Sequence, residues 1–224
     1  MVKTVKLFVE GGGDSNSLRR ECRAAFSSFL EKAGLSGYMP RVVASGSRIA
    51  AYSDYCTAIA NGEDAVFLVD SEAAIILPSN HLDHDIDNIQ SWDPWYHLQH
   101  RQSVTGEIAD PWAKPSGVSN DDCHLMVQSM ESWFLADIAA LRIYYGSELN
   151  ENCLPKRKDI ENIEKDTVID SIRAATVNTR KGRYSKGNHS FGILMSIDPN
   201  IVANHSPWAK RFISLLSNKM RSIR

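Results

Sequence analysis

The segment that most constrains the fold is Ala65 to Val69, a short run in which every residue is apolar. A strand that is apolar on both faces has to be covered on both, which is typical of a central strand in a parallel sheet with helices on each side. The run ends abruptly in Asp70-Ser71-Glu72. It therefore predicts an α/β fold with carboxylates at the carboxyl end of a buried strand.

The first sixty residues repeat a strand–turn–helix pattern. Lys3 to Glu10 alternates apolar and polar residues as a strand does, Gly11 to Gly13 turn the chain, and a helix follows until Gly34. Pro40 to Ala44 predicts a second strand, and Ser47 predicts the cap of a second helix. The residues expected to face inward on that helix are Ile49, Tyr52, Cys56, Ile59 and Ala60. This alternation favours a mostly parallel, Rossmann-like sheet.

The rest of the chain is less regular. Residues from about 78 to 121 are rich in Pro, Trp, His and Asp, and predict a long insertion with little regular structure. A strand is expected from His124 to Gln128 and one helix from Ser129 to Tyr145. Further helices are expected at Asp159 to Ala175, near Phe191 to Ile197, and at Pro207 to Ile223. We expect an α/β domain over residues 1–146, and a helical extension over 147–224 packed on the same domain.

Composition excludes several classes of protein. The chain has 25 Lys plus Arg against 27 Asp plus Glu, so contact with nucleic acid would need a local basic patch. Its four cysteines are at least thirty residues apart without a Cys-x-x-Cys pair, which favours reduced thiols over a zinc knot or a disulfide frame. No apolar run approaches the ~20 residues of a membrane span, and Val2 to Val9 is too short and too charged for a signal peptide. We therefore expect a cytoplasmic protein without a membrane partner.

Three acids follow apolar strands, where ligands of open parallel sheets bind. Glu10 ends the first strand, and Asp70 and Glu72 are two residues apart after a later one, so both would point the same way if the strand continues. Carboxylates grouped on one face suit Mg²⁺. Asp14, on the glycine loop, can reach a second ion or simply cap the helix that follows.

These residues resemble a known family. Glu10-Gly11-Gly12-Gly13-Asp14 and Asp70-Ser71-Glu72 look like the two acidic motifs of the TOPRIM fold, which topoisomerases, primases and overcoming-lysogenization-defect nucleases share. With the strings His124 to Trp133 and Tyr184 to His189, nearly the whole chain is similar to a bacterial family of stand-alone TOPRIM-like proteins encoded beside an AAA or ABC-type ATPase.

The resemblance implies a set of functional residues. In nucleases of this layout, acids matching Glu10, Asp14, Asp70, Glu72 and Glu131 bind two Mg²⁺ or Mn²⁺ ions. A lysine faces the scissile phosphate there; Lys186 is the best match, with Lys165 as the alternative. Glu72 departs by one methylene from the commoner Asp-x-Asp motif. Glu131 could instead stabilise the start of a helix.

The chemistry expected of such a site is phosphodiester hydrolysis. Two divalent ions can clamp the attacking and leaving oxygens, Glu10 would take part in catalysis, and Lys186 would neutralise charge on the phosphorane. Arg180, Lys181 and Arg183 form a candidate backbone-phosphate track, or an ordinary solvated surface. The expected partners are DNA or RNA and a nearby-encoded ATPase, with a homo-oligomer open.

Two functions stay open at this point. The first is a metal-dependent TOPRIM-type nuclease, the effector of an ATPase-linked phage-defence system; the alternative is a non-catalytic metal-binding module that docks on the ATPase. Walker and Rossmann nucleotide sites are excluded by the glycine spacing. The string His81, Asp83, His84, Asp85 and Asp87 matches no zinc signature and favours a polar loop. Trp92, Trp95 and Trp112 favour packing of the insertion, with base stacking as the lesser reading.

Overall fold

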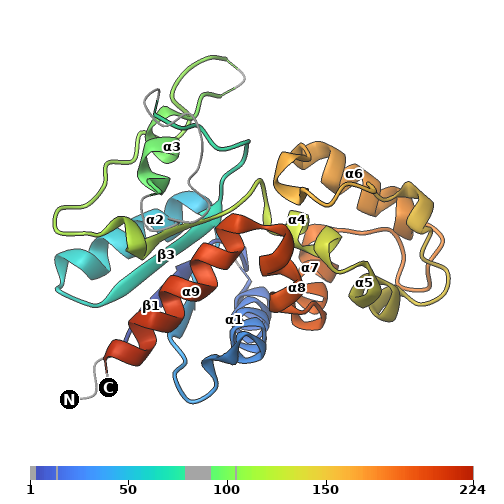
Figure 1. Cartoon of the computed structure of the whole chain (residues 1–224), viewed down its shortest axis with the longest axis horizontal. Helices are drawn as coiled ribbons and strands as arrows, with labels where there is room; N and C mark the ends of the chain where they lie inside the picture. Colours follow the sequence, from blue (N-terminus) through green and yellow to red (C-terminus); the bar gives the residue numbers. More distant parts are fainter. Residues whose placement is uncertain (1–3, 14, 79–91, 104, 224) are drawn as a thin grey trace.

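The structure, a computed structural model, describes residues 4–13, 15–78, 92–103 and 105–223. Within these ranges, one parallel four-stranded sheet lies at the centre of the fold (Figure 1). Its order is β2-β1-β3-β4, made of β1 (Lys6–Val9), β2 (Arg41–Ala44), β3 (Ala65–Asp70) and β4 (Cys123–Met126). The expected α/β class is confirmed. All carboxyl ends of the strands lie at one edge, because every pairing is parallel.

Helices cover both faces of the sheet (Figure 1). They are α1 (Asn16–Leu30), α2 (Arg48–Ala60), α3 (Pro94–His100), α4 (Met130–Ala136), α5 (Ile138–Tyr145), α6 (Lys165–Thr176), α7 (Lys186–Ser196), α8 (Pro199–His205) and α9 (Pro207–Ser222). Val5, Leu7 and Val9 of the first strand segment pack with α1 in one core, while Phe8 packs with α2 in the other. The alternation seen in the sequence therefore places successive side chains of β1 in the two cores, one on each face of the sheet.

Local signals place the first two helices as expected. The Ser15 side chain accepts a hydrogen bond from the backbone of Leu18 at the start of α1, and Ser47 does the same for Ala50 at the start of α2. The chain then leaves α1 through a π-helical turn, Glu31–Leu35, in which Gly34 has φ 88°. Glycine adopts this left-handed conformation without strain, so the predicted stop at Gly34 is confirmed.

The buried face of α2 differs from the prediction. Ala51, Tyr55 and Ala58 face the sheet, whereas Ile49 is 71% exposed. Tyr52 is only partly buried and stacks on Trp112 of the insertion, with ring centroids 4.7 Å apart. Of the stripe used for the prediction, Tyr52, Cys56 and Ile59 are partly buried against the second core, while Ile49 and Ala60 are exposed. Small alanines on the buried face allow the helix to approach the strands.

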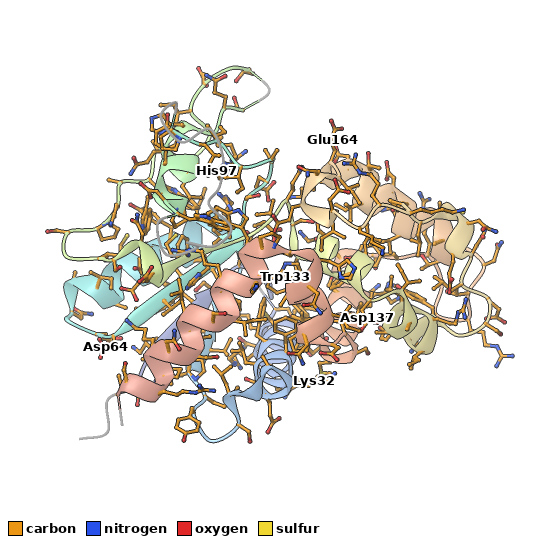
Figure 2. All side chains as sticks on the ribbon, in the orientation of Figure 1. Lys32, Asp64, His97, Trp133, Asp137 and Glu164 are labelled. Atoms are coloured by element: carbon orange, nitrogen blue, oxygen red, sulfur yellow. The ribbon has the colours of Figure 1, made fainter. Side chains whose placement is uncertain are left out.

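The single helix expected from Ser129 to Tyr145 is broken at Asp137 (Figure 2). One carboxylate oxygen of Asp137 accepts from the backbone of Ala140 at 3.0 Å and caps α5. The other accepts from the backbone of Asp198 at 3.0 Å. A long-range partner thus fixes the break, and no local pattern announces it. Trp133, on the preceding helix α4, is fully buried and stacks on Phe29.

The insertion after β3 packs on the sheet through its tryptophans. Trp92, Trp95 and Trp112 are each at most 6% exposed, which confirms packing over a stacking platform. The insertion also contains α3, which the sequence did not predict. The string from His81 to Asp87 lies outside the described residues.

The C-terminal helices share a core with the sheet. Helix α7 lies against α1, and α9 lies against β4 (Figure 1). Phe191 and Phe212 from these helices belong to the same apolar cluster as Leu7 of β1. Among the described helices, none combines the length and the hydropathy that a membrane crossing requires.

Candidate functional site

Three carboxylates converge at the carboxyl edge of the sheet. Glu10 directly follows β1, Asp70 is the last residue of β3, and these two strands are neighbours. With Glu72, each acid offers an oxygen atom, and the three atoms lie within 4.8 Å of one another. The three acids predicted from the strand ends are therefore brought together by the parallel pairing.

Asp70 is the most deeply placed of the three, with 2% of its surface exposed. Its Oδ1 accepts from the backbone N–H of Met130 at 2.8 Å, at the first residue of α4. Burial, followed by the charge of Glu10, raises the pKa of Asp70 to about 8. Burial likewise raises the pKa of Glu10, whose carboxylate is near the backbone N–H of Asp70. Both acids therefore resist carrying negative charge in this position.

Glu72 reaches the site through a turn, not along a continuing strand as the spacing suggested. The strand β3 ends at Asp70, and Glu72 has φ 67° while its N–H donates to Gln128 O at 2.8 Å. Both oxygens of Glu72 accept from Lys165 Nζ at 2.6 Å. Burial would raise the pKa of Glu72, but the Lys165 ammonium outweighs this and lowers it.

Lys186 reaches two of the acids. Its Nζ lies 3.5 Å from Asp70 Oδ2 and 3.6 Å from Glu131 Oε2. Desolvation would lower the pKa of Lys186, yet the surrounding carboxylates, led by Asp70 and Glu131, raise it. The helix expected near Phe191 to Ile197 begins earlier, because Lys186 is the first residue of α7.

Glu131 lies behind the three converging acids. It is fully buried, its Oε1 accepts from the Tyr184 hydroxyl at 2.7 Å, and that hydroxyl also lies 2.7 Å from Ser190 Oγ. Glu131 does not belong to the group whose oxygens meet within 4.8 Å. In this arrangement Glu131 forms an ion pair with Lys186. Asp14, the remaining predicted ligand, lies outside the described residues.

Arg48 is a site residue that the sequence analysis missed. Its Nη1 donates to the carbonyl of Asp70 and lies 3.9 Å from Glu10 Oε2, while Nη2 donates to Asp110 at 2.9 Å. Arg48, Lys165 and Lys186 each occupy the first position of a helix. The helix dipole disfavours a cation there, so a cation directly after the predicted Ser47 cap is the signal that could have identified Arg48.

A glycine loop forms one wall of the site. Gly11 and Gly46 exchange two backbone hydrogen bonds of 2.9 Å, which draws the β1–α1 and β2–α2 connections together. A Cβ atom on Gly12 would lie 2.7 Å from Arg19 Cα, and one on Gly46 would lie 2.8 Å from Gly13 O. Both glycines have positive φ, so this close approach requires them.

A cavity of about 270 Å³ opens between this loop, the acids and α7. Glu10, Asp70 and Lys186 form its charged side. Leu18, Met126, Met130 and Phe191 contribute apolar side chains to its lining. Glu10 and Asp70 therefore face a partly open cavity with an apolar surface beside them.

The predicted basic stretch lies along the connection that leads into α7. Arg180 pairs with Glu148, with Nε and Oε1 3.4 Å apart, and Lys181 Nζ lies 4.6 Å from the centre of the Tyr144 ring. Arg183 is exposed. The chain runs from these residues directly to Lys186 in the site, and Arg180 keeps 91% of its side chain exposed.

The acid group fits a hard divalent cation. All its candidate ligand atoms are carboxylate oxygens, which Mg²⁺ and Mn²⁺ prefer over sulfur or imidazole ligands. A cation between Glu10 and Asp70 would also offset the repulsion and the desolvation that raise both of their pKa values. Both oxygens of Glu72 accept hydrogen bonds from the Lys165 ammonium, so Glu72 could bind the metal ion only by giving up at least one of these contacts.

A family model matches most of the chain. No curated protein and no solved structure matches the chain. Residues 9–217 match the family described as Domain of unknown function (DUF4276), a range that includes the acids, both lysines and the basic stretch. The chain therefore belongs to the DUF4276 family of domains of unknown function.

Proposed function

We propose that this protein is a metal-dependent nuclease that hydrolyses phosphodiester bonds. The observation that carries the proposal is the meeting of Glu10, Asp70 and Glu72 within 4.8 Å at the carboxyl edge of the sheet. Two lysines flank these acids, as a site for an anionic substrate requires. The resemblance to TOPRIM nucleases, in both acidic motifs, supports the same reading.

Glu10, Asp70 and Glu72 would hold Mg²⁺ or Mn²⁺. Bound there, the ion would supply Lewis acidity and a more acidic water. A second ion, as the resemblance implies, would need Asp14, because Glu131 is engaged by Tyr184 and Lys186. Two groups position the others. Glu131 forms an ion pair with Lys186, and the Met130 N–H donates to one oxygen of Asp70.

Lys186 is the residue of this chain best placed to act on the phosphate. Half of its side chain is exposed, Lys186 lines the cavity, and its ammonium lies 3.5 Å from Asp70 Oδ2. A fixed cation at this point stabilises charge that develops on phosphate oxygens during hydrolysis. Arg48 plays a different part, since it holds the Asp70 carbonyl and is tied to the insertion through Asp110.

One observation favours a second candidate. Lys165 contacts both oxygens of Glu72 at 2.6 Å, an arrangement that also suits an ion pair with a purely structural role. In that case the protein would be a cytoplasmic metal-binding module regulated by a partner ATPase, and it would cleave nothing by itself. The first candidate has DNA or RNA as its partner, and the same ATPase as its regulator.

The test is cleavage of labelled DNA and RNA by the purified protein in Mn²⁺, Mg²⁺ or EDTA. We expect cleavage with either metal, none in EDTA, and at least about a thousandfold slower cleavage by Asp70→Asn, which replaces an anionic ligand with a neutral amide without adding bulk. Asp54→Asn is the matched control, because Asp54 is an exposed acid on α2 outside the site. It should cleave at the wild-type rate.

The outcomes separate the two candidates. Metal binding without cleavage of any substrate favours the regulatory module. Equal cleavage by wild type and Asp70→Asn would remove the carboxylates from the reaction and would contradict both candidates.

A further inference from the structure

We propose that the cavity beside the carboxylates takes one unstacked nucleotide, and that the substrate is therefore single-stranded nucleic acid. The inference rests on the proposed function, which it sharpens from phosphodiester to substrate class. It comes from the depth of the acids, the chemistry of the cavity lining and the size of the space.

Two of the three acids have little contact with solvent. Asp70 is 2% exposed, and the Glu10 side chain is 20% exposed. An ion held by them keeps its oxygen ligands about 2.1 Å away, so the scissile phosphate has to enter the cavity with the ion. The nucleotide attached to that phosphate must follow, and it can do so only after leaving the base stack.

The apolar lining suits a nucleobase. Phe191 and Leu18 line the cavity together with Met126 and Met130. Phe191 lies close to the glycine loop, since its ring atom Cζ is 3.4 Å from the position that a Cβ on Gly11 would take. Apolar and aromatic side chains bind the faces of bases without regard to sequence, and methionine adapts its shape to different partners.

The lining offers little to read a base edge. Among the lining residues that the structure describes, none is Asn, Gln, Thr or His. Ser190 lines the cavity, but its hydroxyl lies 2.7 Å from the Tyr184 hydroxyl. Specific recognition of a base requires hydrogen bonds to its edge, so we expect the cavity to accept any base.

The size of the space sets a limit of one nucleotide. At about 270 Å³ the cavity lies just below the ~300–1,000 Å³ that is usual for drug-sized ligands. Gly187 lines it within the first turn of α7, and a Cβ added there would meet no atom within 4 Å. The φ of Gly187 is not in the left-handed region, so a larger side chain at this position can fill the space without backbone strain.

The experiment measures binding by fluorescence anisotropy, with Ca²⁺ in place of Mn²⁺. The probes are a labelled single-stranded DNA, the same sequence as a blunt duplex, and single-stranded RNA. The variants are Gly187→Ala, Gly187→Leu and the control Asn188→Leu, an exposed neighbour on α7 that does not line the cavity. Thermal melts confirm that each variant folds, and Mn²⁺ titration confirms that the acids still bind metal.

We expect the wild type to bind single strands at least tenfold more tightly than the duplex. Gly187→Leu should lose at least tenfold of this single-strand affinity, Gly187→Ala should lose less, and Asn188→Leu should match the wild type. The DNA and RNA arms identify which single strand is preferred. Equal affinity for duplex and single strand, or wild-type single-strand binding by folded Gly187→Leu, would overturn the inference.

Failure of the inference differs from failure of the proposed function. Metal-dependent cleavage that is equally fast on duplex and single strand, and unaffected by Gly187→Leu, would refute the nucleotide cavity and leave the nuclease intact. Tight single-strand binding that Gly187→Leu abolishes, in a protein that never cleaves, would refute the nuclease and support the cavity.

Discussion

Two regions of this protein bury charge, and they are built in opposite ways. Arg211 on α9 is fully buried, yet its guanidinium donates to the carbonyls of Cys123 and Asn120 at 2.9 and 2.8 Å and lies 3.0 Å from His124 Nδ1. At the carboxyl edge of the sheet, by contrast, burial raises the pKa values of both Glu10 and Asp70. The charge of Glu10 raises the pKa of Asp70 further.

The difference separates a charge whose partners the fold supplies from a group of acids that lack enough cationic partners. The acceptors around Arg211 come from backbone and side chains that the fold already places there, so the charge stabilises one arrangement of β4 and α9. Near Asp70, four described carboxylates, including Glu131, meet three described cationic side chains, Arg48, Lys165 and Lys186. A surplus of buried negative charge is a cost that a bound cation removes.

The largest effect on stability is expected at Arg211, whose buried charge is hydrogen-bonded. Arg211→Met leaves several buried acceptors without donors, and should lower the free energy of unfolding by about 3 kcal/mol, or the melting temperature by roughly 6–12 °C. Calorimetry of both variants tests the comparison, since Asp70→Asn should not destabilise the metal-free protein. A small loss in Arg211→Met and a large one in Asp70→Asn would reverse the roles of the two regions.

The next effect concerns Lys186 and the rate of cleavage. Lys186→Met should slow single-turnover cleavage at saturating substrate by about a hundredfold, because in the proposed reaction the ammonium stabilises charge that develops in the transition state. Lys165→Met should change the rate less, since Lys165 faces Glu72. A rate defect confined to Lys165→Met would assign the phosphate-facing role to that lysine and leave the acid group unchanged.

A smaller effect is the pH dependence of stability without metal. Folding raises the pKa of Asp70 to about 8, so the folded state binds this proton more tightly than the unfolded state does. Stability from this group is therefore lost as pH rises from about 4 towards 8. Between pH 6.5 and 8.5 the metal-free melting temperature should fall by a few degrees, at about 2–4 °C per kcal/mol.

The window is chosen to avoid His97, because burial lowers the pKa of this histidine to about 4. The difference between wild type and Asp70→Asn in melting temperature should then narrow as pH falls towards 6.5. If the melting temperatures of wild type and Asp70→Asn instead change in parallel from pH 6.5 to 8.5, folding does not raise the pKa of Asp70.

The smallest effect is expected at the basic stretch. Arg180→Ala and Arg183→Ala should each weaken nucleic-acid binding and lower the slope of log affinity against log salt by roughly one contact, or about 0.7–0.9. Turnover at saturation should stay at the wild-type value, because these exposed side chains lie outside the acid group. An unchanged salt slope would show that the substrate takes another path to the cavity.

The sequence predicts what depends on neighbouring strands. Glu10, Asp70 and Glu72 could be assigned to one site because apolar runs identify parallel strands, whose carboxyl ends share one edge. The lysines and Arg48 join this site from three helix starts that are distant in sequence. Only Lys186 and Lys165 were suggested, and only through resemblance.

What depends on tertiary partners could not be read from the sequence. The break at Asp137 requires the N–H of Asp198, sixty-one residues away, and the turn at Glu72 requires Gln128 O. The prediction of the buried face of α2 was wrong because the stripe it used lies to one side of the sheet, where Tyr52 stacks on Trp112 of the insertion and Ile49 stays exposed. Local periodicity shows that a stripe is apolar, and it does not show which neighbour covers it.

The central claim is that the acid group at the carboxyl edge is a cation site, and isothermal titration of Mn²⁺ tests it most directly. Wild type should show saturable binding, Asp70→Asn should bind at least tenfold more weakly, and Asp54→Asn should match the wild type, because only Asp70 belongs to the converging group. A titration with no saturable binding to wild type, or equal binding to Asp70→Asn, would contradict the account.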